Sequence, residues 1–167
     1  DDAVADRWDI ANEVLGAGGL ERYEISNWTT PGNASTHNGL YWACGEYLGI
    51  GAGAHSHIAT DDAATRSWAV KGPERYVDTV NAGGRPIAGA EAIDGSTRAS
   101  EVMVLGLRRT TGVAEAEFEA LVGRPIDAVF ESELDEAVRK GLVERREGAV
   151  VLTRPFLANA ATVLFAR

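Results

Sequence analysis

Hydrophobic residues near the start of the chain recur at intervals of three and four, as on one face of an amphipathic helix. A glycine-rich stretch at residues 16–19 follows and is expected to end that helix. Residues 21–28 then alternate as in a strand, residues 29–36 are rich in turn-forming residues, and the apolar run Leu48–Ile50 predicts a short buried strand. The helical face comprises Val4, Trp8, Ala11 and Leu15.

Helical spacing returns at Pro73, a residue that fits the first turn of a helix because it lacks an N–H group. This helix would carry Tyr76, Val77 and Val80 on its apolar side. Two glycines and a proline then interrupt the pattern, so residues 83–95 are predicted to form a linker.

Residues 96–167 combine three helical patterns, a hairpin and a last helix, an order typical of a small winged-helix-like domain. Asp94 or Ser96 can cap the first helix, and Thr153 can cap the last. The hairpin is predicted to turn at Glu147-Gly148. The predicted inward faces of the four helices comprise Ala99, Val102, Met103, Gly106 and Leu107; Phe118, Leu121 and Val122; Ile126, Val129, Phe130, Leu134, Ala137 and Val138; and Phe156, Leu157, Ala160, Val163 and Leu164.

The composition is that of a soluble globular protein, with 45% hydrophobic and 25% charged residues among 167. No apolar run approaches the roughly 20 residues that a membrane helix needs, and the first ten residues hold no signal-peptide core. The net charge of −9 opposes binding to phosphate backbones and makes nucleic acid an unfavourable partner. The single cysteine, Cys44, excludes an internal disulfide and a multi-cysteine metal site, and we expect a cytoplasmic location.

Aromatic, polar and glycine residues crowd between Tyr23 and His57, in the segments YEISNW, HNGLYW and YLGIGAGAHSH. If HNGLYW is helical, His37 and Tyr41 share one face. His37 could then be an axial iron ligand, with the Tyr41 oxygen as an alternative and Trp42 as a flat apolar wall. The competing interpretation is a buried histidine whose nitrogens bond the backbone, between ordinary core aromatics.

Gly49, Gly51 and Gly53 alternate in the last of these segments. Because glycine has no β-carbon, another molecule could approach the backbone there, and its N–H and C=O groups could hydrogen-bond a flat base. Tight packing or a bulge explains the glycines equally well. The spacing is not the GxGxxG of a dinucleotide site. His55 and His57 point the same way in an extended chain, but the further ligands of a metal site are missing.

Two arginine pairs, Arg108–Arg109 and Arg145–Arg146, are candidates for phosphate contacts. The second pair lies on the predicted hairpin, where DNA-binding winged helices contact the backbone. Glu144 and Glu147 flank that pair, however, and mixed charge of this kind is typical of a solvated surface.

The segments YEISNW, HNGLYW and YLGIGAGAHSH are followed by Trp68, GPERY, EVMVLGLRRTTGV and a Gly-Leu hairpin that ends in VLT. In this order they resemble the radical SAM family that contains the oxygen-independent coproporphyrinogen III oxidases and the HemW heme chaperones. The resemblance covers almost the whole chain. The HNxxYW segment is its most specific part and favours the HemW branch.

The resemblance implies an α/β plus α+β fold, the C-terminal fragment of a partial (β/α) radical SAM barrel followed by a winged-helix-like domain. Residues 1–60 would be the last helix and strands of a truncated barrel, residues 61–95 a connecting helix and linker, and residues 96–167 the winged-helix-like domain. Full-length members bind S-adenosylmethionine and a [4Fe–4S] cluster held by three cysteines. With one cysteine, this chain is expected to hold no cluster and to catalyse no radical chemistry alone.

The resemblance also implies two groups of cofactor-binding residues, one toward S-adenosylmethionine and one toward heme. His37 matches a family histidine suspected of contacting heme, and it is the candidate heme iron ligand. The candidates are Gly49, Ile50, Gly51, Gly53 and Ala54 on the S-adenosylmethionine side, and His37, Tyr41 and Trp42 for heme.

We therefore expect this chain to be the C-terminal portion of a HemW-like protein. That protein would handle heme or, alternatively, oxidise coproporphyrinogen III. The expected partners are heme or porphyrin, the N-terminal half of the barrel, and a second copy of the chain paired through an exposed strand edge. The alternative function is a winged-helix module that binds a protein or DNA.

Overall fold

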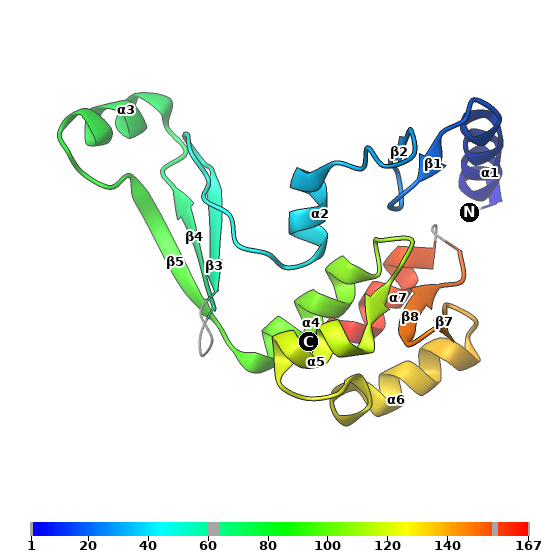
Figure 1. The fold of residues 1–167 in the computed structure, drawn as a ribbon. Helices are drawn as coiled ribbons and strands as arrows, with labels where there is room; N and C mark the ends of the chain where they lie inside the picture. The colour runs from blue at the N-terminus through cyan, green and yellow to red at the C-terminus, as the bar shows by residue number, and fades with distance from the viewer. Residues whose placement is uncertain (1, 60–63, 155–156, 167) are drawn as a thin grey trace. The chain divides into compact units, whose positions relative to one another are not determined.

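A computed structural model describes residues 2–59, 64–154 and 157–166 of the chain (Figure 1). The chain forms two compact units. The first unit combines the N-terminal 44 residues with the chain from Ala99 onward, and the second unit is Gly45–Arg98. No helix in the described part of the chain is both long and apolar enough to cross a membrane.

The first unit opens with the predicted helix, α1 (Asp2–Ala17), whose Trp8 and Leu15 are half-buried. The prediction of a single strand over residues 21–28 is wrong. Two short antiparallel strands, β1 (Glu21–Arg22) and β2 (Trp28–Thr29), form a hairpin there, because the chain turns between them around a buried carboxylate, Glu24.

Helix α2 (Thr36–Trp42) contains the HNGLYW segment, as the spacing requires. Ser35 caps it, since its hydroxyl accepts a hydrogen bond from the Asn38 N–H at 3.2 Å. The helix ends at Trp42 after two turns, with Ala43 as its C-cap.

The rest of the first unit contains the predicted helices and hairpin, with one additional short strand. Its strands form a sheet in the order β6-β8-β7, in which β8 pairs antiparallel with both neighbours. Glu147 and Gly148 both have positive φ angles, 51° and 77°, so the hairpin turns where the sequence predicts. The elements are α4 (Gly95–Gly106), β6 (Val113–Ala114), α5 (Glu115–Val122), α6 (Ile126–Arg139), β7 (Val143–Arg146), β8 (Ala149–Leu152) and α7 (Ala158–Phe165).

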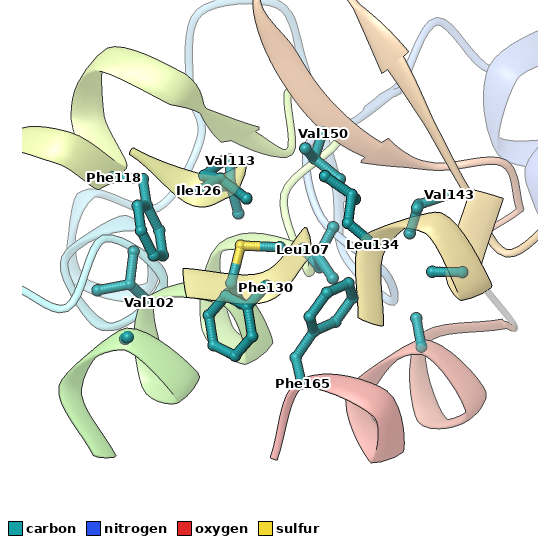
Figure 2. Close-up of a cluster of buried hydrophobic side chains, with 14 residues drawn as sticks. Val102, Leu107, Val113, Phe118, Ile126, Phe130, Leu134, Val143, Val150 and Phe165 are labelled. Carbon is teal, nitrogen blue, oxygen red and sulfur yellow. The ribbon is translucent and has the colours of Figure 1, made fainter. Parts of the chain in front are cut away.

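These elements enclose one hydrophobic core, in which Phe130 lies between two other aromatic rings (Figure 2). Its ring centroid is 6.1 Å from that of Phe118 and 5.5 Å from that of Phe165, both in edge-to-face geometry. The core comprises Ala99, Val102, Met103, Leu107, Val113, Phe118, Ile126, Phe130, Leu134, Ala137, Val143, Val150, Ala161 and Phe165.

The predicted inward face of α4 is confirmed, and Asp94 rather than Ser96 caps this helix by accepting the Thr97 N–H at 2.7 Å. The inward face of α6 is confirmed at four positions, but Val138 is 47% exposed. Thr153 does not cap the last helix, because its hydroxyl donates to the carbonyl of Gly141.

The predicted inward face of the last helix is confirmed at Leu164, which packs against the core, and is wrong at Ala160 and Val163, which are exposed. Ala161 and Phe165 are buried, whereas Val163 is 75% exposed. The helix begins only at Ala158, so its core-facing stripe is shifted. Phe156, also predicted to face inward, lies outside the described residues.

The second unit is a three-stranded antiparallel sheet in the order β3-β4-β5, with α3 (Pro73–Asn81) at one end (Figure 1). Its strands are β3 (His55–Ala59), β4 (Ala64–Ala69) and β5 (Ile87–Ile93). Pro73 occupies the first turn of α3, as predicted. The linker predicted for residues 83–95 is wrong, since most of it is β5 and pairs with β4 along its length.

The short buried strand predicted at Leu48–Ile50 is also wrong. Leu48 is 73% exposed and Ile50 is 83% exposed, and the segment is an irregular loop ahead of β3. Its apolar side chains have no covering element among the described residues. The two compact units do not follow the divisions predicted at residues 60 and 95, which stay predictions about a longer parent fold.

Candidate functional site

Helix α2 places the candidate heme ligands on one face. The His37 and Tyr41 rings meet edge to face with centroids 4.8 Å apart, as expected for residues four apart on a helix. His37 is exposed, and Tyr41 and Trp42 are half-buried. The interpretation of His37 as a buried core histidine is therefore wrong, and its imidazole is open to a ligand from solvent.

The predicted role of Trp42 as a flat apolar wall is limited by a contact within the chain. The Arg108 guanidinium lies over its ring, 4.3 Å from the centroid, in cation–π geometry. The indole N–H is buried and finds no acceptor among the described residues. One face of this ring is thus occupied by the protein itself.

A buried carboxylate lies in the same unit, and sequence reasoning missed it. The Glu24 side chain has no exposed surface. Its Oε1 accepts hydrogen bonds from the Ser26 N–H at 2.7 Å, the Ser26 hydroxyl at 3.1 Å and the Asn27 amide at 2.6 Å. Its Oε2 lies 3.2 Å from the Arg108 guanidinium. The signal in the sequence is the Glu-x-Ser-Asn spacing, whose donors can fold back onto the carboxylate.

These contacts also set the ionisation of Glu24. Burial opposes the charged form and would raise the pKa. The three hydrogen bonds from the following turn and the positive charge of Arg108 together outweigh burial, so the pKa of Glu24 is lowered below its ordinary value. Glu24 is therefore a paired anion at neutral pH rather than a proton donor.

The first two sequence segments and the LRRT segment meet around this carboxylate. Asn38 of α2 donates its amide to the Tyr23 hydroxyl at 3.2 Å. The Tyr23 carbonyl accepts the Thr110 N–H at 3.2 Å. Arg108 joins Glu24 on one side and Trp42 on the other.

Both arginine pairs considered for phosphate contacts are engaged with carboxylates. Arg109 makes a two-point contact with Glu117, at 3.0 and 2.6 Å. Arg145 pairs with Glu115 and Asp127, and Arg146 pairs with Glu144. These ion pairs give the DNA-binding alternative no support.

The candidate S-adenosylmethionine segment folds tightly against its own unit. A β-carbon on Gly49 would lie 2.0 Å from the His55 carbonyl oxygen. The Gly49 N–H donates to the Ser56 hydroxyl at 3.0 Å and the Gly51 N–H donates to the Tyr76 hydroxyl at 3.1 Å. Packing within the chain is thus sufficient to explain why residue 49 is a glycine.

A cavity of about 450 Å³ opens beside this segment, within the second unit. Its walls are mainly apolar, and Ser56, Ser67, Tyr76 and Arg85 are the lining residues with polar side chains. The lining residues are Leu48, Gly49, Ile50, Ser56, Ser67, Ala69, Tyr76, Arg85, Pro86 and Ile87. A concave apolar site with a few polar groups is the usual form of a small-molecule pocket.

Metal ligands do not gather in the described part of the chain. No group of three His, Cys, Asp or Glu residues there could hold an ion. His55 is exposed, whereas His57 is buried with its Nδ1 3.0 Å from the Gly45 carbonyl oxygen. Cys44 packs against the core of the first unit. One thiolate does not fit a four-iron cluster, which is held by several cysteines.

Known proteins resemble the chain over most of its length. Residues 93–155 match the HemN C-terminal domain. The heme chaperone HemW of Bacillus subtilis is 36% identical over 149 residues, 89% of this chain and 38% of that protein. HemW of Mycobacterium tuberculosis (strain H37Rv) is 34% identical over 130 residues, 78% of this chain and 32% of that protein. The chain thus spans about a third of these relatives' length.

This chain resembles the C-terminal part of the HemW heme chaperones. The family resemblance predicted from its sequence segments is thereby confirmed. The HemN C-terminal match runs from the end of β5 through β8 and includes the helices α4, α5 and α6 that form most of the core. The remaining similarity to HemW extends toward the N-terminus, over the segments that sequence reasoning selected.

The fold agrees with the HemW relationship. The solved structure of the Escherichia coli coproporphyrinogen III oxidase HemN, described as a radical SAM enzyme, matches with a TM-score of 0.68. The match covers 94% of this chain and 39% of that chain at 14% identity. At this identity the similarity shows the fold alone, a mixed α/β arrangement shared with part of a radical SAM protein.

Proposed function

We propose that this chain handles heme as the C-terminal part of a HemW-like radical SAM protein, and that His37 binds the heme iron. The observation that carries the proposal is the exposed His37 imidazole, set edge-on against Tyr41 on a capped helix. Imidazole is a common axial ligand of heme iron. Tyr41 would contact the porphyrin beside it, and so would the part of the Trp42 ring that Arg108 leaves uncovered.

Heme titration of the full chain tests this assignment. We expect His37→Ala to weaken heme binding and to shift the Soret band, because the iron loses its nitrogen ligand. His55→Ala is the matched control, since it removes another exposed histidine from the second unit. If wild type and His37→Ala give the same spectrum and affinity, His37 is not the ligand.

We also propose that Gly49, Ile50, Gly51, Gly53 and Ala54 face S-adenosylmethionine in the complete protein. The adjacent 450 Å³ cavity supports this assignment, because it combines apolar walls with hydroxyl and guanidinium groups. These residues would hold the adenosine part in place and shield it from water. S-adenosylmethionine supplies the radical precursor when a cluster is present, and this chain's single cysteine does not fit that cluster.

The finer fold assignment belongs to the same proposal. We infer that α1, the β1–β2 hairpin, α2 and the loop before β3 are the last part of a partial (β/α) barrel. Residues 96–167 would be a winged-helix-like domain, and the four helices that share a core with the β6-β8-β7 sheet support this inference.

Exposed apolar side chains support the proposed partners, which are the N-terminal half of the barrel or a second copy of the chain. Val4, Ile10 and Val14 of α1 and the loop residues Leu48 and Ile50 are all more than half exposed. Analytical ultracentrifugation distinguishes a self-associating chain from a monomer. A concentration-independent monomer would remove the second copy as a partner.

A further inference from the structure

Helix α2 is fixed to the first unit along one face. Asn38 and Trp42 are four residues apart and therefore lie on the same side of the helix. Asn38 donates to the Tyr23 hydroxyl, and Trp42 lies under the Arg108 guanidinium. His37 and Tyr41 each precede one of these residues, so their face is rotated by about 100° around the helix axis.

The anchor behind this face is an ion pair between a buried carboxylate and a partly exposed arginine. Arg108 reaches Glu24 at 3.2 Å, and the carboxylate has no exposed surface. Removing Arg108 would leave the buried Glu24 carboxylate without its countercharge, so separating the two groups is costly. Because the same guanidinium lies on Trp42, any displacement of Arg108 also removes the support under the end of α2.

We propose that Glu24, Arg108 and Trp42, here called the anchoring cluster, position His37 for heme. This inference rests on the proposed function, because it assigns the cluster a role in the same binding event. The cluster holds the Asn38–Trp42 face of α2 against the first unit and thereby presents the His37–Tyr41 face outward. Arg108 touches no heme in this account and is a positioning residue.

The test compares Arg108→Lys with Arg109→Lys in the full chain. Lysine keeps the charge at position 108 but loses the planar group that lies on Trp42. Arg109 is the matched control, because its partner is Glu117, outside the anchoring cluster. We expect Arg108→Lys to weaken heme binding about tenfold or more, as loss of an outer support of a metal ligand does, and Arg109→Lys to bind like wild type.

Added imidazole separates positioning from general structural damage. If Arg108→Lys only misplaces His37, free imidazole should restore the wild-type Soret band, as it should for His37→Ala. Should Arg108→Lys fail to fold, as judged by circular dichroism, Asn38→Ala replaces it and should show a smaller loss with the same rescue.

The outcomes distinguish the two proposals. If wild type and His37→Ala give the same heme spectrum, the proposed function itself is overturned. If the wild-type spectrum depends on His37 but the folded test variant, Arg108→Lys or its replacement Asn38→Ala, keeps the wild-type heme affinity and spectrum, the positioning role alone is overturned. Weak binding that imidazole does not restore also counts against positioning, because the defect then lies outside the iron ligand.

Discussion

Gly49 shows how strongly a single residue can be fixed by its neighbours. A β-carbon there would lie 2.0 Å from the His55 carbonyl oxygen, a distance that no packed atom tolerates. We expect Gly49→Ala to lower the free energy of unfolding by about 1–3 kcal/mol, the usual cost of overpacking. Gly16→Ala is the control, since its β-carbon meets nothing within 4 Å inside α1. Urea unfolding measures both variants. Equal free energies of unfolding for Gly49→Ala and Gly16→Ala would contradict the packing argument.

Glu24 should make stability depend on acid. Its pKa in the folded chain is lowered from the ordinary value of about 4.5 that it has in the unfolded chain. The stabilisation is therefore complete above the unfolded pKa and is lost as the pH falls through the lower folded pKa. We expect Glu24→Gln to be less stable than wild type at pH 7, and the difference to shrink below about pH 4.

Urea titrations at a series of pH values measure this effect. Glu119→Gln makes the same chemical change at an exposed position of α5 and serves as the control. The quantity to compare is the free energy of unfolding of wild type minus that of Glu24→Gln. If this difference stays constant as the pH falls to the folded pKa and below it, the ionised carboxylate does not stabilise the fold.

The contacts of individual residues are predictable from the sequence where the spacing along one helix face determines them. His37 and Tyr41 meet as the helical spacing requires. Sequence reasoning did not find Glu24, because the donors that hold a buried carboxylate include Arg108, which lies 84 positions along the chain. The exposure of His37 was equally out of reach, since it depends on which side of α2 is anchored.

Helix α6 offers the clearest test at the level of elements. The spacing predicts that Phe130 and Val138 lie on the same inward face, but Phe130 is fully buried and Val138 is 47% exposed. We expect Phe130→Ala to cost about 3–5 kcal/mol, because it opens a cavity between two aromatic rings. Val138→Ala should change the free energy of unfolding by no more than about 0.5 kcal/mol. Thermal and urea unfolding of both variants check the contrast, and similar losses would refute it.

Elements with strong periodicity were predictable, and elements defined by their partners were not. The α4 face and the Glu147-Gly148 turn follow from local spacing and turn chemistry. The β5 strand was mistaken for a linker, because IAGAEAI has few β-branched residues and its stability comes from pairing with β4. Leu48–Ile50 was mistaken for a buried strand, because an apolar run does not reveal whether another element covers it.

At the scale of the whole molecule, the two units differ in how much apolar surface they bury. The first has a continuous core of fourteen buried hydrophobic side chains. The buried hydrophobic residues described in the second are few, namely Ala64, Ala69, Val70 and Ile93. Together with exposed Leu48 and Ile50, this thin core favours a partner for the second unit.

The chain as a whole should not assemble a radical SAM cluster. Three cysteine ligands are needed in the family it resembles, and Cys44 is the one cysteine present. Anaerobic reconstitution with iron and sulfide should therefore give less than one four-iron cluster per chain, measured by absorption and iron content. A full-length relative with its cysteine motif is the positive control. A stoichiometric cluster on this chain would overturn the assignment.

The contact between Arg108 and Trp42 has a practical consequence for optical work. Trp42 is one of four tryptophans and lies five residues from His37. A porphyrin bound at His37 would absorb the light that this indole emits, so quenching of intrinsic fluorescence would follow the titration without an added dye. The difference in emission between wild type and Trp42→Phe, recorded before any porphyrin is added, would isolate the signal of the ring that the guanidinium covers.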